Sequence, residues 1–183
     1  QREAFGFYTW MKFNGKEMCE SMDRMDPVLT LRFDYMSGDD PDTKGKFEGF
    51  DSMYAEWPKY SELLIYQLWD PFVLAHNNGA SDPNMGAFTN MYFPSVHLDL
   101  TPECFDDKIT TTLGYRYMLA DEKKTPYGHD GREIGNLGQF LANYNITRGL
   151  SAHFLFDYFV PGNYYTRDAD DSWFARVQMM YKF

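Results

Sequence analysis

A strict alternation of apolar and polar side chains recurs along this chain, and no other feature constrains its fold as strongly. Within residues 109–119, for example, Leu113 and Tyr115 share one face. This period of two is typical of β-strands, whose successive side chains point to opposite faces. Seven segments show it: residues 3–13, 28–35, 89–100, 109–119, 134–147, 150–160 and 173–183. The sequence therefore predicts an all-β, antiparallel fold.

The predicted strands are long. Each spans about ten residues, which matches the roughly 9–11 residues of a tilted strand that crosses a bilayer, whereas strands of soluble proteins average roughly 5–6 residues. Aromatic side chains also stand near the strand ends, where an interfacial girdle would lie: Trp10, Phe13, Tyr35, Trp173, Tyr181 and Phe183. Both features favour a transmembrane, up-and-down β-barrel of outer-membrane type. A soluble antiparallel sheet with one face in a core and one in water is the alternative.

Composition argues against several other classes of protein. The chain of 183 residues has a net charge of −10, which argues against nucleic acid as a partner because a polyanion is repelled. Aromatic residues make up 19% of the chain, whereas disordered chains are poor in them. No window approaches the ~20 apolar residues of a helical membrane span. The two cysteines, Cys19 and Cys104, leave open whether they pair, and no Cys/His spacing predicts a metal site.

The predicted connections alternate between short and long. Outer-membrane barrels have short periplasmic turns and longer extracellular loops, so this alternation fits a barrel and makes the last strand run downward. The four connections are residues 101–107, 120–133, 147–149 and 161–171, the first and third of them short.

Residues 37–87 break this rhythm. We predict one long extracellular loop there, part of which can fold into the barrel mouth, and an eighth strand at residues 63–69 is the alternative. Counting back from the last strand, the first of seven strands also runs downward, and bacterial barrels normally have an even number of strands. We therefore expect residues 1–183 to be a single β-barrel domain that forms the C-terminal part of a larger barrel and does not close by itself.

Charged and polar side chains on the inward faces of these strands are the candidate pore-lining residues. They are Arg32, Asp34, Arg116, His153, Asp157, Arg176 and Lys182. Four of them are cations and two are carboxylates, and lumen charge tunes the selectivity of such barrels. The count predicts passage of anionic solutes. A ladder of cross-strand ion pairs that only braces the wall is the alternative.

Ser151, His153 and Asp157 share one face and raise the alternative of an outer-membrane hydrolase. A serine nucleophile needs its base within hydrogen-bond reach. Residues two apart on a strand are roughly 6.5–7 Å apart, so a solvated polar lumen explains these side chains better, and we expect no enzyme activity.

Residues 40–51 nearly fit a calcium-binding loop, with Asp40 and Asp42 at its first and third positions. Lys44 stands where a third oxygen ligand belongs, and the last position holds Asp51 rather than a bidentate Glu. An acidic surface loop is therefore the expected structure, with no metal or other cofactor.

Several segments resemble the alginate-export family of outer-membrane barrels. Tyr35-Met36-Ser37-Gly38-Asp39-Asp40 resembles that family's strand ending in Ser-Gly-Asp. Asp157-Tyr158-Phe159-Val160-Pro161-Gly162 resembles its penultimate strand, which ends in an aromatic pair followed by Pro-Gly. Ile134-Gly135 resembles the glycine that opens an earlier strand, and the terminal Phe183 resembles the signal that delivers barrels for insertion.

This resemblance implies a porin of the bacterial outer membrane. Such a channel would pass anionic polysaccharide or small anionic solutes by passive diffusion. Its partners would be outer-membrane lipid and lipopolysaccharide, the transported solute, and other outer-membrane or periplasmic subunits. The alternative is a structural or scaffold barrel within a larger outer-membrane assembly, with its pore plugged by residues 37–87.

Overall fold

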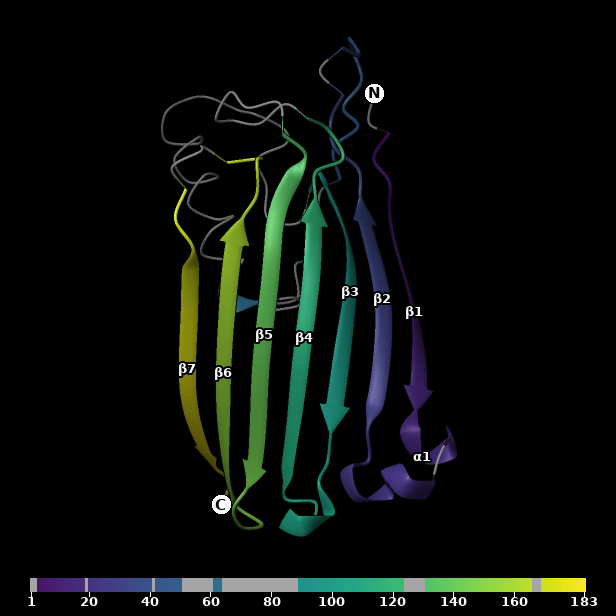
Figure 1. Cartoon of the computed structure of the whole chain (residues 1–183). Helices are drawn as coiled ribbons and strands as arrows, with labels where there is room; N and C mark the ends of the chain where they lie inside the picture. Colours follow the sequence, from purple (N-terminus) through teal and green to yellow (C-terminus); the bar gives the residue numbers. More distant parts are fainter. Residues whose placement is uncertain are drawn as a thin grey trace.

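The protein, described here by a computed structural model, is built on one antiparallel sheet of seven strands in the order β1-β2-β3-β4-β5-β6-β7 (Figure 1). The structure describes residues 3–18, 20–40, 42–50, 61–63, 89–123, 131–165 and 169–183. The strands are β1 (Gly6–Asn14), β2 (Val28–Met36), β3 (Met91–Leu100), β4 (Ile109–Leu119), β5 (Glu133–Asn145), β6 (Leu150–Pro161) and β7 (Ser172–Tyr181). Each corresponds to one predicted segment, so the predicted all-β antiparallel fold is confirmed.

The two predicted short connections, residues 101–107 and 147–149, lie at one end of the sheet, and the two predicted long ones, residues 120–133 and 161–171, lie at the other (Figure 1). The longer β1–β2 connection, residues 15–27, also lies at the end with the short connections, which we call the short-connection end. The short-connection end carries α1 (Gly15–Met18) and the 3-10 turns η1 (Glu20–Met25) and η2 (Glu103–Phe105). Cys104 of η2 has an exposed, free thiol, and Cys19 lies outside the described residues. Among the described residues, no helix is long and apolar enough to cross a membrane.

The described strands form an open sheet, not a closed barrel. Each strand pairs with its neighbours in sequence, and no pairing joins β1 to β7 among the described residues. The prediction that these residues do not close by themselves is thereby confirmed, and both edge strands run in the same direction (Figure 1). The alternative eighth strand falls largely on residues 64–69, outside the described residues.

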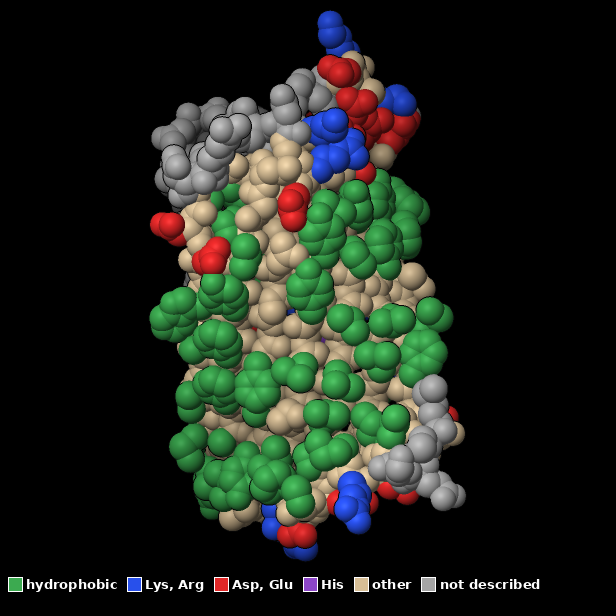
Figure 2. All heavy atoms as spheres, viewed as in Figure 1, with side chains coloured by type: hydrophobic (Ala, Val, Ile, Leu, Met, Phe, Trp, Pro, Cys, Tyr) green, Lys and Arg blue, Asp and Glu red, His purple; other side chains and the backbone are tan. Residues whose placement is uncertain are grey.

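The two faces of the sheet differ in chemistry. We call the face with Asp34, Arg116 and Asp157 the inner face, and the opposite one the outer face. Figure 2 shows hydrophobic side chains over most of the height of the outer face, with Lys, Arg, Asp and Glu gathered at its two ends. Leu113 and Tyr115, which share one face of their predicted strand, are exposed there, as are Phe154, Phe156 and Val177.

The inner face is apolar where it approaches the long connections. Its buried side chains there form one core: Met36, Leu63, Met91, Phe93, Met118, Ala120, Ile134, Leu137, Phe159 and Tyr164. Fully burying a side chain of this size stabilises a fold by roughly 1.5–3 kcal/mol, so this cluster holds the connections to the sheet. The inner face is therefore not polar over its whole height.

Gly135 lets the chain enter β5 close to β6. Its φ of 147° lies in a region that side chains disfavour. A Cβ at this position would lie 2.4 Å from the carbonyl oxygen of Val160. The β4–β5 register also shifts between Met118 and Leu119, opposite this point. Only glycine fits this irregular and crowded strand start.

Candidate pore-lining face

Polar side chains of six strands, β2 to β7, occupy the middle of the inner face. The strand register places them side by side, because residues paired across strands point to the same face. The members are Arg32, Asp34, Ser95, His97, Asp99, Thr112, Arg116, Gln139, Asn143, His153, Asp157 and Arg176. This polar belt divides into two parts, one bordering a cavity and one covered by residues 61–63.

The open part of the belt lies on β2 to β4, and side chains of β1 border the same cavity. A cavity of about 430 Å³ is lined there by side chains of all four strands, including Lys12, Thr30, His97 and Asp99. The Thr112 hydroxyl donates a hydrogen bond of 2.6 Å to Asp99 Oδ1. The cavity is thus surrounded by hydrogen-bonding and charged groups that a polar solute can contact.

Arg32 and Asp34 form a bidentate ion pair beside this cavity. Arg32 Nε and Nη2 donate hydrogen bonds of 2.6 Å to Asp34 Oδ2 and Oδ1, respectively. Paired bonds of this kind are geometrically specific and stronger than bonds between neutral groups. Both residues line the cavity, and Arg32 is the more accessible of the two, since its side chain is 26% exposed and that of Asp34 is 2% exposed.

The covered part of the belt centres on Asp157 of β6, whose exposure is 0%. Its carboxylate accepts a hydrogen bond of 2.5 Å from the Ser61 hydroxyl and one of 2.9 Å from Gln139 Nε2. Leu63, two residues after Ser61, lies in the apolar core. Part of the predicted loop at residues 37–87 is therefore packed against the inner face.

Arg176 of β7 belongs to the same covered part. Its guanidinium forms an ion pair with Glu62, and its Nη2 contacts His153 Nε2 at 3.2 Å. Because arginine only donates, His153 Nε2 is the acceptor and Nδ1 carries the proton. Nδ1 then donates to Asn143 Oδ1 at 2.8 Å. Both ring nitrogens of His153 are thus engaged, and neither is directed at Ser151.

The structure separates the predicted pore-lining residues into three places. Arg32, Asp34 and Arg116 belong to the open part, whereas His153, Asp157 and Arg176 belong to the covered part. Lys182 lies beyond the end of β7 and is exposed, with its backbone amide bonded to Gly149. They therefore do not form one continuous lining.

The predicted excess of positive charge is also reduced on the inner face. Glu62, which the sequence count omitted, pairs with Arg176, and Asp34 pairs with Arg32. Arg116 borders the cavity but is only 6% exposed. The exposed cation of the cavity is Lys12 of β1, which the sequence reasoning missed because β1 alternates weakly.

Trp10 lies on the opposite face from the one predicted. It pairs with Arg32 across the β1–β2 ladder, as its neighbour Tyr8 pairs with Asp34, so both rings point to the inner face. The two rings stack at a centroid distance of 5.6 Å, and the Arg32 guanidinium lies 5.0 Å from the Tyr8 ring centre. Trp10 is therefore part of the polar cavity and not of an outer girdle.

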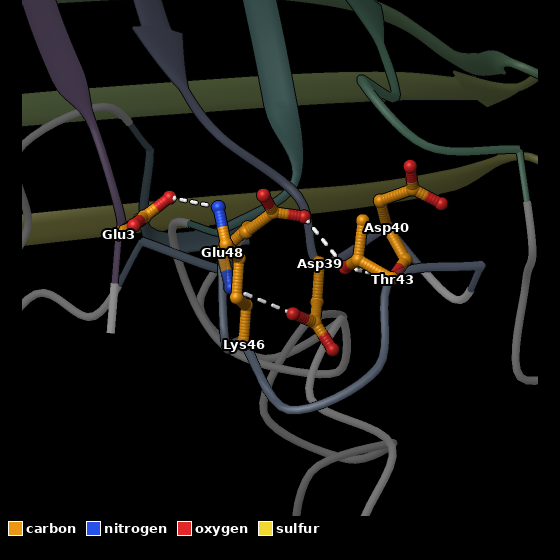
Figure 3. Close-up of polar contacts among 6 residues, drawn as sticks. All are labelled: Glu3, Asp39, Asp40, Thr43, Lys46 and Glu48. Atoms are coloured by element: carbon orange, nitrogen blue, oxygen red, sulfur yellow. Dashed lines mark hydrogen bonds and ion pairs between the residues drawn. The ribbon is translucent and has the colours of Figure 1, made fainter. Parts of the chain in front are cut away.

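At the long-connection end, the acidic residues Asp39, Asp40 and Glu48 make polar contacts with neighbouring residues, and Lys46 pairs with Glu3 (Figure 3). The Thr43 hydroxyl donates to Glu48 at 2.8 Å, and the Glu48 amide donates to Asp39 at 2.7 Å. Asp40 Oδ1 accepts from the Asp42 amide. Within the described part of the chain, no group of three residues is arranged to hold a metal ion, and Asp51 lies outside it.

A second acidic pair, Asp121 and Glu122, lies beside this segment. Asp121 accepts hydrogen bonds from the Tyr35 hydroxyl at 2.9 Å and from the Gly38 amide at 3.0 Å. Burial, together with the charges of Asp121 and Asp40, raises the pKa of the Glu122 carboxyl above its usual 4.5. Together with Asp39, Asp40 and Glu48, these two residues form an acidic rim at the long-connection end. The rim is negatively charged, and its like charges repel one another.

No protein-family model, curated protein or solved structure matches the chain. The interpretation of the inner face therefore rests on its own geometry. The resemblance of residues 35–40 and 157–162 to alginate-export barrels stays a prediction.

Proposed function

We propose that this chain forms part of the wall of a bacterial outer-membrane β-barrel of the alginate-export type, which passes anionic polysaccharide or small anionic solutes by passive diffusion. The observation that carries the proposal is the contrast between the two faces of one sheet. Hydrophobic side chains cover the outer face, and a polar belt with a cavity occupies the inner one.

The outer face supports a membrane location. Soluble monomers rarely expose apolar patches larger than a few hundred Å², whereas lipid and lipopolysaccharide chains would cover such a face favourably. Strands of 9 to 13 residues are long enough to cross a bilayer when tilted. Phe13 and Tyr181, on the outer side near the short-connection end, fit one interfacial girdle.

The open edges require partners under this proposal. In hydrocarbon, every unpaired backbone amide or carbonyl costs several kcal/mol, so β1 and β7 must pair with further strands. Because both edge strands run in the same direction, an antiparallel closure needs an odd number of added strands. A further segment of the same protein or another outer-membrane subunit would supply them.

The inner face supports anion passage in its open part. Three cations, Lys12, Arg32 and Arg116, and two carboxylates, Asp34 and Asp99, line the cavity there. The cations are in excess, and charged side chains that line a pore bias its selectivity. The acidic rim does not line this cavity.

A plugged scaffold barrel is the second candidate. Its support is the packing of Ser61 and Glu62 against the covered part of the inner face, through Asp157 and Arg176. If this packing extended across the whole lumen of the complete barrel, the pore would be closed and the protein would serve as a structural subunit.

Conductance across a planar lipid bilayer separates the two candidates. We expect the complete barrel, with the strands that pair with β1 and β7 in place, to pass an open current whose reversal potential in a salt gradient shows anion preference. A folded, inserted complete barrel that passes no current would reject the channel and favour the scaffold.

A substitution on each face tests the membrane location itself. Phe154→Lys places a charge on the outer face and should destabilise the inserted protein by about 2–4 kcal/mol if it lies near mid-membrane. Gln178→Lys is the matched control, since Gln178 lies at almost the same depth on the inner face. Equal folding of both variants in lipid vesicles would show that the outer face does not meet hydrocarbon.

A further inference from the structure

We propose that Tyr8 and Trp10 form a stacking platform for the sugar rings of a linear saccharide, with the polar side chains around the cavity binding its hydroxyl groups. This inference rests on the proposed function, because it assigns a binding site within the proposed pathway. It starts from the unexpected place of Trp10, a large aromatic ring on the polar face of the sheet.

The platform has an open surface. Tyr8 is 54% exposed and Trp10 is 53% exposed, and both border the cavity of about 430 Å³. Their rings stack on each other with an inclination of 22°, and the Arg32 guanidinium lies over the Tyr8 ring. The stacked pair therefore forms one aromatic surface along β1, of which the exposed part of the Trp10 ring is the part most accessible to a sugar.

The groups opposite the rings fit hydroxyl recognition. Thr30, His97, Asp99, Thr112 and Lys12 supply donors and acceptors around the same cavity. A pyranose ring has an apolar face of C–H groups and a periphery of hydroxyls, and ligand sites commonly combine aromatic surfaces with a few placed polar groups. An apolar ligand would displace water from these polar groups without replacing its hydrogen bonds, which is costly.

Lys12 gives the site a preference among saccharides. It lies two residues after Trp10 on the same face of β1 and is exposed. A uronic acid carries one carboxylate on each ring, so Lys12 can pair with it while the ring stacks. We therefore expect an anionic saccharide to bind more tightly than a neutral one of the same length.

Calorimetric titration of the full chain in detergent micelles tests the site. The probes are a galacturonic acid hexasaccharide and a neutral glucose hexasaccharide. Trp10→Ala should weaken binding of both about tenfold, which corresponds to about 1.4 kcal/mol. Trp10→Phe should keep most of the affinity because a ring remains. Lys12→Gln should remove the preference for the galacturonic acid probe.

Trp173→Ala is the matched control, because Trp173 is also an exposed strand tryptophan that stacks on a neighbouring ring but lies on the outer face. Its affinity should equal that of the wild type. Unchanged binding by Trp10→Ala, or an equal loss in Trp173→Ala, would overturn the site. Binding in micelles needs no open pore: saccharide binding with a silent bilayer would reject the channel alone, whereas anion current without saccharide binding would reject this site alone.

Discussion

The open and covered parts of the inner face show how one polar belt can serve two purposes. Over β1 to β4, polar groups border a cavity, and Arg32 and Lys12 reach toward it. Over β5 to β7, the same kind of groups bond to Ser61 and Glu62. A polar group that meets water exchanges its partners at little cost, whereas one that is buried depends on fixed partners. The covered part therefore contributes to stability, and the open part remains available for a solute.

Removing a buried carboxylate from each part should give the largest difference between them. Asp157→Ala leaves the Ser61 hydroxyl and the Gln139 amide without their acceptor, and we expect a loss of about 3 kcal/mol of unfolding free energy. Asp34→Ala removes the carboxylate partner of Arg32, but the Arg32 side chain is 26% exposed and can be hydrated from the cavity, so the loss should be smaller. Urea unfolding in lipid vesicles measures both.

Asp157→Asn sharpens this test, because the amide oxygen keeps one acceptor for Gln139 or Ser61. It should fall between wild type and Asp157→Ala. If Asp34→Ala destabilised the protein as much as Asp157→Ala does, the open part would be as dependent on fixed partners as the covered one.

Charge changes in the two parts should also differ in their effect on ion selectivity. Lys12→Gln removes an exposed cation from the open cavity and should shift the reversal potential toward cations. The double variant Glu62→Gln/Arg176→Gln removes an ion pair of zero net charge from the covered part, so its reversal potential should stay close to that of the wild type. Single-channel recording in a salt gradient checks both, and the opposite ranking would place the ion path along the covered part.

The sequence predicted the strands but not this division of the inner face. Alternation is clearest in β4, β6 and β7, so their strand bounds and faces follow directly from the pattern. In β1, Tyr8 and Trp10 stand on one face while Phe7 and Phe13 stand on the other, and period two cannot distinguish two aromatic faces. Here the cross-strand pairing with Arg32 decides the orientation.

The partners of Asp157 and Arg176 were also beyond sequence reasoning. Ser61 is 96 positions from Asp157 in the chain, and no periodic pattern links residues 61–63 to β6. The apolar end of the inner face had a weak signal, because Met36, Met118 and Phe159 fall on inward positions next to the long connections. Reading those positions as a core would have indicated that the connections fold back onto the sheet.

The smallest expected effect concerns the acidic rim above the open part. Because the pKa of Glu122 is raised in the folded protein, the folded state binds this proton more tightly than the unfolded state. That contribution to stability is present below the ordinary pKa and is lost as the pH rises through the raised one. Glu122→Gln should therefore be more stable than wild type at pH near 7, and this advantage should disappear at pH near 4.

Urea unfolding midpoints of wild type and Glu122→Gln at both pH values measure the effect. Glu103→Gln is the control, since Glu103 is exposed at the opposite end of the sheet and has no part in the rim. The covered part lies away from Glu122, so Asp157→Ala should cost the same in either background. An advantage of Glu122→Gln that persisted at the lower pH would mean that the raised pKa is not its cause.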